Sequence, residues 1–455
     1  MNFMGKIQKK PQSEKPVAAK KSSQPLQAVK GTRDLLADEI WLMERIRVKF
    51  LEIAFAYGFD GIETPVLENT EVFARGMGRA TDVVQKQMYS FRTKGGDAVT
   101  MRPEYTAGIV RAYYENGMFN MPQPLKLWYW GPVFRYERPQ AGRYREFHQL
   151  GAEIIGERNA VLDAQLVQFF WVCLKDLGIT AITVEINSIG CMVCRPGYRV
   201  ALVNYFRQDA RKLCQDCKRR LKESPLRIFE CEEIRCKEMA EKAPQTVDHL
   251  CEECHDHFRE VLEMLDELEI PYHLNARLVR GIDYYTKTVF EIWPDGKPGF
   301  ALGGGGRYDY LVETLGDKSA PAVGFSGGVE RIVDELKNIN APIIRNIVVP
   351  TVFLAQLGDL GRKKSLRLFE DLRKVGIRVL ESFGRNSIKS QLKVANREDA
   401  PFSLIMGQKE ALDGTVIVRD MASGTQETVL LAKLIPELQK RFTKTSMQLG
   451  DKTAV

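Results

Sequence analysis

Apolar residues first recur at helical spacing between Leu42 and Tyr57. The intervals there are four, four, three and four residues, which places the apolar side chains on one face of a helix. Gly58 follows directly and is placed to end this helix. After it, the sequence predicts a short strand from Ile62 to Val66.

A longer apolar and aromatic run, from Leu125 to Glu137, predicts a strand. The polar residues that follow are typical of a turn, and the run from Arg145 to Ile155 returns as a second strand, so we expect an antiparallel hairpin. A helix from Val161 to Gly178 and a strand from Ile182 to Gly190 come next. The first part of the chain is therefore predicted to form an antiparallel sheet flanked by helices.

The pattern changes twice after this region. Between about Cys191 and Ile270 the chain is Cys-rich, charged and helix-prone, which we interpret as an insertion, because strands and glycine turns resume at Arg277. A helix begins at Val329, and beyond Ile343 strands and helices alternate, which is typical of a separate α/β domain. The predicted organisation is a basic disordered tail (1–28), a main domain in two parts (29–190 and 271–340), the Cys-rich insertion (191–270), a C-terminal domain (343–443) and a short tail (444–455).

Composition narrows the class of protein. The chain has 455 residues, 44% of them hydrophobic, which suffices for about three domains with a sizeable core. It contains no run of about 18 apolar residues and no apolar leader, so we expect a cytoplasmic protein without a membrane span. Most of the net charge of +7 comes from residues 1–30, where seven Lys stand against one Glu. Such a tail either contacts RNA non-specifically or is a solvated extension.

The usual nucleotide-binding fingerprints do not occur in this sequence. It has neither a GxxxxGK[ST] loop nor a GxGxxG turn between a strand and a helix, so an ATP site needs another geometry. Gly303 to Gly306 leave room either for a ligand close to the backbone or for a plain tight turn. The Tyr pair that follows Arg280, and the glycines before Glu330 and Arg331, are weaker signals, because both patterns are also typical of packing.

The densest candidate chemistry lies on the predicted hairpin. Arg135 and Glu137 share one face of its first strand. On the second strand, Phe147, Gln149 and Glu153 share a face. Arg binds phosphate through its forked donors, and an aromatic ring stacks on a base. The other interpretation is a solvated charged face, which this mixture of residue types makes weaker.

Eight of the nine cysteines fall into four pairs: Cys191/Cys194, Cys214/Cys217, Cys231/Cys236 and Cys251/Cys254. In a reducing compartment these spacings favour metal ligation over disulfides, and we predict structural zinc. Two sites of four thiolates allow three ways of combining the pairs. The spacing of the first two pairs matches a zinc site, and that of the last two comes close to one. The alternative is four pairs of reduced thiols without a metal.

Seven segments together resemble histidyl-tRNA synthetases, a family of class II aminoacyl-tRNA synthetases. They occur in that family's order between Lys30 and about Ile332, and the C-terminal domain, with GQKE and IVRDM, is similar to the family's anticodon-binding domain. The resemblance implies an α+β catalytic domain with an antiparallel sheet, interrupted by the Cys-rich helical insertion and followed by a C-terminal α/β anticodon-binding domain. The segments are KGTRDLLADE, FDGIETPVLE, MRPEYTAG, GPVFRYERPQAGRYREFHQLGAE, VRGIDYYTKTVFE, GGGGRYD and GFSGGVERI.

The same resemblance implies roles for individual residues. Arg135 and Arg280 are implied as catalytic residues that stabilise negative charge at phosphorus, and Pro65 as part of a homodimer interface. Tyr105 stands where the family usually has a small residue. The residues implied in histidine binding are Glu104, Tyr105, Thr106, Arg135, Gln149, Glu153, Arg280, Tyr284 and Tyr285, and those implied in ATP binding are Arg135, Glu137, Arg143, Phe147 and Arg331.

The activity implied is the ATP-dependent ligation of L-histidine to tRNA(His), with Mg²⁺ bridging phosphate oxygens. The implied partners are L-histidine, ATP, tRNA(His) and a second copy of the chain. The main alternative is the regulatory subunit of ATP phosphoribosyltransferase, which shares the fold but typically lacks the anticodon domain. Arg135, Arg280 and Arg331, together with about 110 residues after Ile343, oppose that alternative. A zinc-dependent nucleic-acid-binding protein without catalysis explains the cysteine pairs alone.

Overall fold

The structure is a computed structural model that describes residues 26–140, 142–296, 299–342 and 350–450. The chain divides into two compact units, Met1–Ile344 and Arg345–Val455, each with its own sheet. The basic tail predicted at 1–28 lies almost wholly outside the described residues, and so do the last five residues of the tail predicted at 444–455. Within the described ranges, every helix is too short or too polar to span a bilayer.

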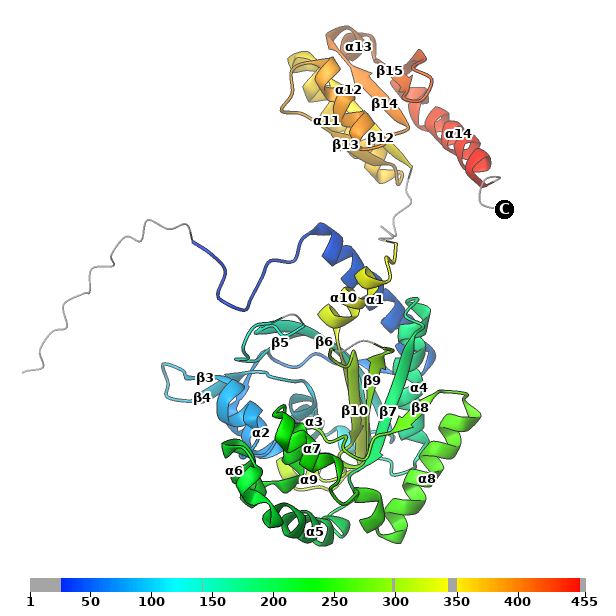
Figure 1. The fold of residues 1–455 in the computed structure, drawn as a ribbon. Helices are drawn as coiled ribbons and strands as arrows, with labels where there is room; N and C mark the ends of the chain where they lie inside the picture. Colours follow the sequence, from blue (N-terminus) through cyan, green and yellow to red (C-terminus); the bar gives the residue numbers. More distant parts are fainter. Residues whose placement is uncertain (1–25, 141, 297–298, 343–349, 451–455) are drawn as a thin grey trace, which may run out of the picture. The chain divides into compact units, whose positions relative to one another are not determined.

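An eight-stranded sheet forms the centre of the first unit (Figure 1). Its two edge strands pair in parallel with their neighbours, and the inner strands pair in antiparallel fashion. The predicted hairpin is the pair β5–β6, with Leu125 opposite Ile155. In spatial order the strands are β1 (Asp60–Gly61), β5 (Leu125–Phe134), β6 (Glu146–Ile155), β11 (Ala322–Gly328), β10 (Gly303–Arg307), β9 (Thr286–Pro294), β7 (Ile182–Ser188) and β8 (Tyr272–Leu274).

Helices cover both faces of this sheet. On one face, α1 (Ala37–Ala56), α4 (Val161–Asp176) and α10 (Val329–Asn338) contribute to a single core. On the other face, α2 (Thr70–Gly76), α3 (Thr106–Glu115) and α9 (Leu311–Leu315) pack beside a small antiparallel sheet. That sheet consists of β2 (Leu67–Asn69), β4 (Ala98–Met101) and β3 (Tyr89–Arg92). The predicted α+β class is thus confirmed.

Two local predictions differ from the structure. The segment from Ile62 to Val66 is not a strand: Pro65 has no N–H to donate to a ladder, and the Thr64 carbonyl accepts a hydrogen bond from the Arg102 side chain. Gly303 to Gly306 form no tight turn but most of the central strand β10. The sheet needs glycine here because a Cβ on Gly305 would lie 2.0 Å from the Gly324 carbonyl oxygen.

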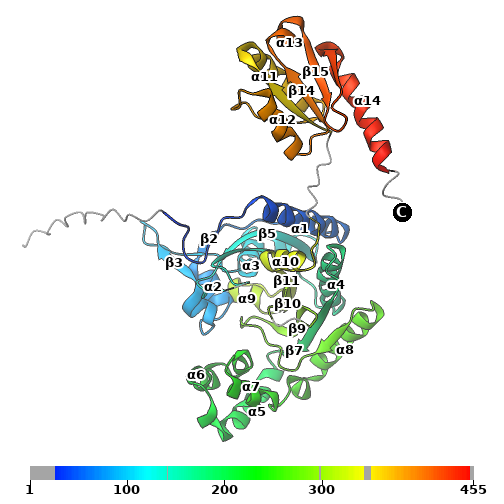
Figure 2. The same cartoon turned by 45° about the horizontal axis from the view of Figure 1, so that its top comes forward.

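The Cys-rich insertion consists mainly of short helices, of which α5, α6 and α7 lie together at one end of the sheet (Figures 1 and 2). They enclose a small core of their own that includes Tyr198, Leu202 and Phe206. The last helix, α8, instead packs into the main core beside α4 through Val261 and Leu265. The helical elements are α5 (Cys194–Gln208), α6 (Gln215–Glu223), a 3₁₀ segment (Pro225–Glu230), α7 (Ile234–Glu241) and α8 (Glu252–Glu267).

The C-terminal unit is a five-stranded mixed sheet with helices on both faces. Its core joins aliphatic residues of the strands to Leu368 and Leu372 of α11 and to Leu434 and Leu438 of α14. Helix α14 continues to Gly450 and so includes the first part of the tail that the sequence predicted at 444–455. In spatial order the strands are β13 (Arg378–Glu381), β12 (Thr351–Gln356), β14 (Phe402–Met406), β15 (Thr415–Asp420) and β16 (Gln426–Leu430); the helices are α11 (Gly358–Lys374), α12 (Ile388–Arg397), α13 (Gln408–Asp413) and α14 (Leu431–Gly450).

Candidate functional site

Two adjoining cavities lie over the glycine-rich centre of the eight-stranded sheet. The larger, of about 440 Å³, opens between the β5–β6 hairpin, the loop before β9 and the start of α10. The smaller, of about 30 Å³, lies deeper and is lined mainly by tyrosines and carboxylates. Arg135, Gln149 and Arg280 line both cavities. Gln149 also has a buried side-chain oxygen without a hydrogen-bond partner among the described residues, which points to a ligand between the two cavities.

Four arginines line the larger cavity: Arg135, Arg143, Arg280 and Arg331. Arg143 and Arg331 each lie 4.8 Å from the ring centre of Phe300, one from the hairpin loop and one from α10. Arg331 donates to the carbonyls of Gly142 and Ala301, at 3.1 and 2.9 Å. Burial and the nearby charges of Arg135 and Arg143 lower the pKa of Arg331 to about 10. A bound polyanion would relieve this repulsion, because guanidinium groups pair readily with phosphate.

Aromatic rings accompany these arginines. The Arg135 guanidinium lies 5.5 Å from the ring centre of Phe147 and donates through Nε to the Pro103 carbonyl at 2.8 Å. Glu137 lies between two of the cations, 4.0 Å from Arg135 and 3.8 Å from Arg143. A hollow with several cations, a carboxylate and exposed ring faces suits a nucleotide, whose base stacks while its phosphates pair with Arg. All five residues predicted to bind ATP thus line one cavity.

Arg280 stands at the border of the two cavities. Its guanidinium donates to Glu291 on β9 and contacts the Gly304 carbonyl at 3.5 Å. Burial opposes its charge, but Tyr285 and Glu291 outweigh this effect, so the pKa of Arg280 is raised. A fixed cation here faces the same space as Arg135. The pair is therefore placed to stabilise an anion that forms between the cavities.

The smaller cavity is built around two buried carboxyl groups. Glu153 accepts hydrogen bonds from Thr106 Oγ1 at 2.7 Å and from the Tyr308 hydroxyl, and burial raises its pKa to about 8. Glu104 accepts from the backbone N–H groups of Thr106, at 2.6 Å, and of Ala107, at 2.8 Å, at the start of α3. Burial raises the pKa of Glu104 as well. Buried carboxyl groups among tyrosines suit a small polar ligand with both donors and acceptors.

Glycines make room for these side chains. A Cβ on Gly324 would lie 1.5 Å from Glu153 Oε2, so only glycine fits opposite this carboxyl group. On β6, a Cβ on Gly151 would lie 2.2 Å from the Tyr129 hydroxyl. Gly324 and Gly151 therefore do more than relax the backbone, because they leave space for polar groups above the middle of the sheet.

One predicted histidine-binding residue lies outside the cavities. The Tyr105 ring points away from the smaller cavity and stacks on Tyr129 at 4.4 Å between ring centres, while the Arg102 guanidinium lies 3.9 Å from its ring centre. The space it fills exists because Gly131 has no side chain, since a Cβ there would lie 2.1 Å from the Tyr105 hydroxyl. Tyr105 thus supports Tyr129, which does line the cavity. The other residues predicted to bind histidine all line the smaller cavity: Glu104, Thr106, Arg135, Gln149, Glu153, Arg280, Tyr284 and Tyr285.

Sequence reasoning assigned no role to four residues that line the cavities. Tyr129 and Tyr308 lie in the smaller cavity, and Glu291 and Phe300 in the larger. Tyr308 comes directly after Arg307, which follows Gly303 to Gly306. This position is the one sequence signal that could have indicated a site residue among the four. Phe300 lies in a loop where no periodicity marks it, and Tyr129 has the pattern of an ordinary core residue.

Comparison with known proteins gives these cavities a context. A sequence profile of histidyl-tRNA synthetases matches residues 31–332, and an anticodon-binding-domain profile matches residues 351–441. The chain is 44% identical over 420 residues to a histidine–tRNA ligase of Dehalococcoides mccartyi, covering 91% of this chain and all of that protein. The chain belongs to the histidyl-tRNA synthetase family.

Two further comparisons agree with this membership. A histidine–tRNA ligase of Pelotomaculum thermopropionicum is 42% identical over 417 residues, covering 91% of this chain and 97% of that protein. The crystal structure of the apo histidyl-tRNA synthetase of Staphylococcus aureus superposes with a TM-score of 0.75 at 33% identity, covering 91% of this chain and all of that one. The predicted family is therefore confirmed, and the regulatory-subunit alternative is not favoured.

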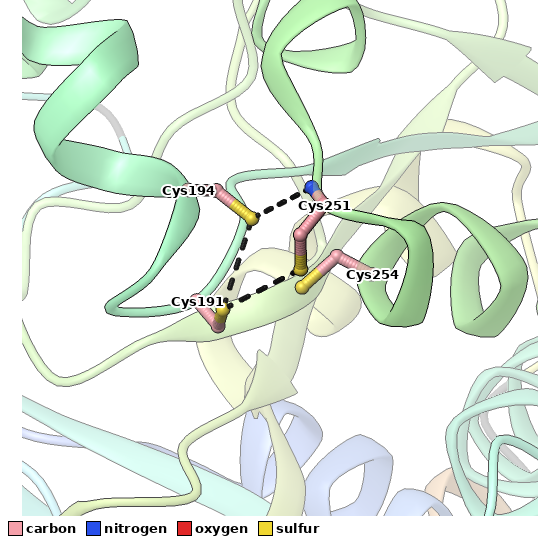
Figure 3. A group of neighbouring side chains, drawn as sticks. All are labelled: Cys191, Cys194, Cys251 and Cys254. Carbon is pink, nitrogen blue, oxygen red and sulfur yellow. Dashed lines mark hydrogen bonds between the residues drawn. The ribbon is translucent and has the colours of Figure 1, made fainter.

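Outside the cavities, this synthetase-family chain carries two groups of four cysteines. We call Cys191, Cys194, Cys251 and Cys254 the outer cluster, which Figure 3 shows, and Cys214, Cys217, Cys231 and Cys236 the inner cluster. Within each cluster the Sγ atoms lie within 4.8 Å of one another, and none forms a disulfide. The spacing match between the first two pairs does not predict the grouping, because the chain folds back so that the fourth pair meets the first and the third meets the second.

The geometry of both clusters suits a tetrahedral metal site. The Sγ–Sγ distances are 3.7 Å for Cys191–Cys194 and 3.9 Å for Cys191–Cys251, and 3.8 Å for Cys214–Cys231 in the inner cluster. A tetrahedral Zn²⁺ with Zn–S bonds of about 2.3 Å places its sulfurs about 3.8 Å apart. Backbone N–H groups also point at the sulfurs, for example Cys251 N at 3.1 Å from Cys194 Sγ. Such donors stabilise thiolates.

Proposed function

We propose that this chain ligates L-histidine to tRNA(His) in two steps that both take place at the adjoining cavities. Histidine occupies the smaller cavity and ATP the larger, so that the histidine carboxylate faces the α-phosphorus at the border. The carboxylate forms a new bond to the α-phosphorus as the bond to pyrophosphate breaks, which yields histidyl-adenylate. The terminal hydroxyl of the tRNA then attacks the histidyl carbonyl, loses its proton and displaces AMP.

One observation carries this proposal: Arg135 and Arg280 each line both cavities, so both guanidinium groups face the space where the two cavities adjoin. Negative charge develops at phosphorus during the first step, and two fixed guanidinium groups stabilise it without having to reorganise. A carboxylate nucleophile needs no general base. Arg143 and Arg331 lie around Phe300, where they suit the outer phosphates, and Glu137 and Phe147 suit the base.

The smaller cavity explains why the amino acid would be histidine. An imidazole presents one nitrogen on each side, and Glu153 and the tyrosine hydroxyls offer hydrogen-bonding groups on several sides of the cavity. Apolar side chains would leave these buried groups unpaired, at a large cost in binding. The cavity of about 30 Å³ has to widen to admit the ligand.

Two kinds of metal ion belong to the proposal. Mg²⁺ bound to ATP would neutralise charge on the phosphates. The nearby carboxylates Glu291 and Glu330 contact Arg280 and His148. Structural Zn²⁺ occupies each cysteine cluster, for which the sulfur spacing is the support. Zinc takes no part in the chemistry, since four thiolates leave it no open position.

The proposal includes a homodimer that works in the cytoplasm, where ATP and tRNA are available. Pro65 and its neighbour Leu67 are exposed in the single chain, as a self-association surface requires. Light scattering coupled to size-exclusion chromatography tests the dimer. A mass near the 51.7 kDa of one chain would contradict it.

The decisive experiment is ATP–pyrophosphate exchange with each of the twenty amino acids in the absence of tRNA. We expect exchange with histidine alone, and a loss of about 10³-fold in Arg280→Ala, because the variant lacks one charge-stabilising donor. Arg277→Ala is the matched control, since this exposed arginine of the same loop pairs with Glu241 at 3.2 Å, away from both cavities. Folded protein that shows no exchange with any amino acid would refute the ligase proposal.

A further inference from the structure

The two cysteine clusters occupy different places in the fold. The outer cluster joins the two ends of the insertion: Cys191 and Cys194 follow β7, and Cys251 and Cys254 lie at the start of α8. Helix α8 is itself anchored in the main core through Val261. An ion in the outer cluster would therefore tie the root of the insertion to the body of the sheet.

All four cysteines of the inner cluster belong to the insertion and lie in its own small core. Its sulfurs connect the start of α6 with both ends of the segment 231–236 that leads into α7. The surrounding core is small, and Cys217, Cys231 and Cys236 are themselves part of it. A core of this size gives little stability without a crosslink. A bound metal would therefore supply much of the free energy that holds the 3₁₀ segment Pro225–Glu230 in place.

This 3₁₀ segment contacts the wall of the larger cavity, in which ATP is proposed to bind. Arg227 donates to Asp82 at 3.0 Å and to the Ala80 carbonyl at 2.9 Å, and Arg220 of α6 donates to the same carboxylate at 2.9 Å. Asp82 directly precedes a single turn of π-helix, Val83–Gln87, whose first and last residues line the larger cavity. Arg220 and Arg227, which lie between cysteines of the inner cluster in the sequence, thus connect the insertion to this wall through Asp82, which Arg219 and Lys86 also contact.

Two carboxylates flank a cysteine of the inner cluster. Glu230 directly precedes Cys231 and lines the larger cavity, and its Oε1 is buried without a hydrogen-bond partner among the described residues. Glu232 directly follows Cys231 and lies 3.6 Å from Arg143. Cys231 therefore fixes the backbone between one carboxylate that faces the cavity and another that contacts an arginine proposed to bind ATP.

From these contacts we propose that the two clusters bind one Zn²⁺ each and that the ions have different effects. The outer ion stabilises the fold of the first unit. The inner ion positions Glu230 at the larger cavity, Arg227 against Asp82 beside its wall and Glu232 against Arg143. It thereby sets the affinity for ATP rather than the rate of the chemical step. Because the readout is ATP use, this inference rests on the proposed function.

The test begins with metal content and stability. Zinc measured by mass spectrometry in chelator-free, zinc-replete protein should be two ions per chain, and one in either Cys254→Ser (outer) or Cys236→Ser (inner). Co²⁺ substitution should give the charge-transfer absorption of a tetrathiolate site in the wild type and in both variants. Cys254→Ser should lower the melting temperature of the first unit more than Cys236→Ser does. Fewer than two ions in the wild type would overturn the proposal.

Histidine-dependent exchange then separates positioning from support of the fold. We expect Cys236→Ser to raise KM for ATP about tenfold while kcat stays within about twofold. Arg227→Met should raise KM for ATP in the same way with both zinc ions retained, and it tests positioning even if Cys236→Ser fails to fold. Lys218→Met, an exposed neighbour on α6, is the control and should leave KM unchanged.

The outcomes distinguish this inference from the proposed function. An unchanged KM for ATP in Arg227→Met, or a loss of kcat alone, would refute positioning even with two zinc ions bound. If wild-type protein with two zinc ions catalyses no exchange with any amino acid, the ligase proposal fails instead. The role assigned to the inner ion then falls with it, whereas two bound ions would still establish the metal sites.

Discussion

The sheet of the first unit buries charged side chains, whereas the sheet of the C-terminal unit is packed with aliphatic ones. In the first unit, Arg102, Glu153, Asp163 and Arg307 are each at most 1% exposed. Across the described part of the C-terminal unit, the buried polar side chains are all neutral: Gln356, Ser365, Gln391 and Ser403. Burial of charge is costly unless the charge is paired, so the difference calls for a reason.

The buried ionisable side chains of the first unit fall into two kinds, those whose interactions are complete within the protein and those whose interactions are not. Arg307 binds Asp163 through Nε at 3.1 Å and also reaches the carbonyls of Glu157 and Asn159, so its donors are satisfied within the protein. By contrast, burial keeps the pKa of Glu153 high, and Arg331 is repelled by neighbouring cations. A buried charge whose interactions are complete therefore supports the fold, and one whose interactions are incomplete marks a ligand site.

The largest loss of stability should follow from breaking the buried ion pair between Arg307 and Asp163. Arg307→Met leaves Asp163 charged and buried with only His257 nearby, at 3.3 Å, and should lower the free energy of unfolding of the first unit by about 3–5 kcal/mol. Burial alone would raise the pKa of Asp163, but Arg307 and His257 outweigh it and lower the value to about 2. All five tryptophans lie in the first unit, so urea unfolding followed by tryptophan fluorescence reports on that unit.

Two variants sharpen this test. Arg259→Met removes an exposed arginine that pairs with Asp256 at 3.1 Å, and should change stability by less than about 0.5 kcal/mol. Asp163→Leu combined with Arg307→Met removes both charges and should recover part of the loss. If the double variant is no more stable than Arg307→Met, the loss comes from packing and the pair is not the cause.

A smaller, pH-dependent effect should follow from Glu153→Gln. In the folded chain Glu153 keeps its proton up to about pH 8, whereas an unfolded Glu releases it near 4.5. Between these values the folded state binds more protons, so the free energy of unfolding falls as pH rises. Removing the ionisable group removes this fall, so the variant should gain about 3 kcal/mol relative to wild type between pH 5 and pH 8.5, while histidine-dependent exchange decreases.

The control for this prediction is Glu146→Gln, an exposed residue at the start of the same strand. Its stability relative to wild type should not change across this pH range. If the difference in free energy of unfolding between Glu153→Gln and wild type is the same at both pH values, Glu153 is already ionised in the folded chain. The smaller cavity would then hold a permanent anion, and its ligand would have to carry a compensating positive charge.

Much of this architecture follows from local patterns in the sequence. Helix α1 is apparent because its apolar face repeats and Gly58, with φ of +74°, ends it, and the β5–β6 hairpin because two aromatic strands flank a polar turn. The strand β10 was not predicted, since glycine has no side chain to show periodicity, and only the three-dimensional neighbours explain the run. Within Ile62–Val66, the Thr64 carbonyl likewise accepts a hydrogen bond from the distant Arg102, which the sequence does not show.

Residues of the site were predictable where a motif carried them. Glu153 and Gln149 share a strand parity with Phe147, and the structure brings all three to the cavities. Tyr105 lies outside the cavities, which the sequence could not show because the space that its ring fills depends on the distant Gly131 of β5. The grouping of the cysteines was likewise open, because spacing along the chain does not show which loop ends meet. Contacts that depend on distant partners leave no local pattern.

The smallest effect should come from the C-terminal unit, where the buried polar groups are neutral. Gln391 accepts from the Gln356 backbone N–H at 3.0 Å and donates to the Gln356 carbonyl at 2.7 Å and to the Arg385 carbonyl at 2.9 Å. Gln391→Leu leaves these backbone groups unpaired, which should cost about 1–3 kcal/mol. Hydrogen exchange should quicken in peptides of β12, while the tryptophan-monitored transition of the first unit stays unchanged.

Gln408→Leu, at the exposed start of α13, is the matched control and should leave exchange in β12 unaltered. If Gln391→Leu were as damaging as Arg307→Met, the contrast between the two sheets would not be one of charge. A network of neutral amide bonds would then support its sheet as strongly as a buried ion pair does. We expect the smaller loss because an unpaired backbone amide costs only its own desolvation, whereas an unpaired carboxylate must either stay charged in the core or take up a proton.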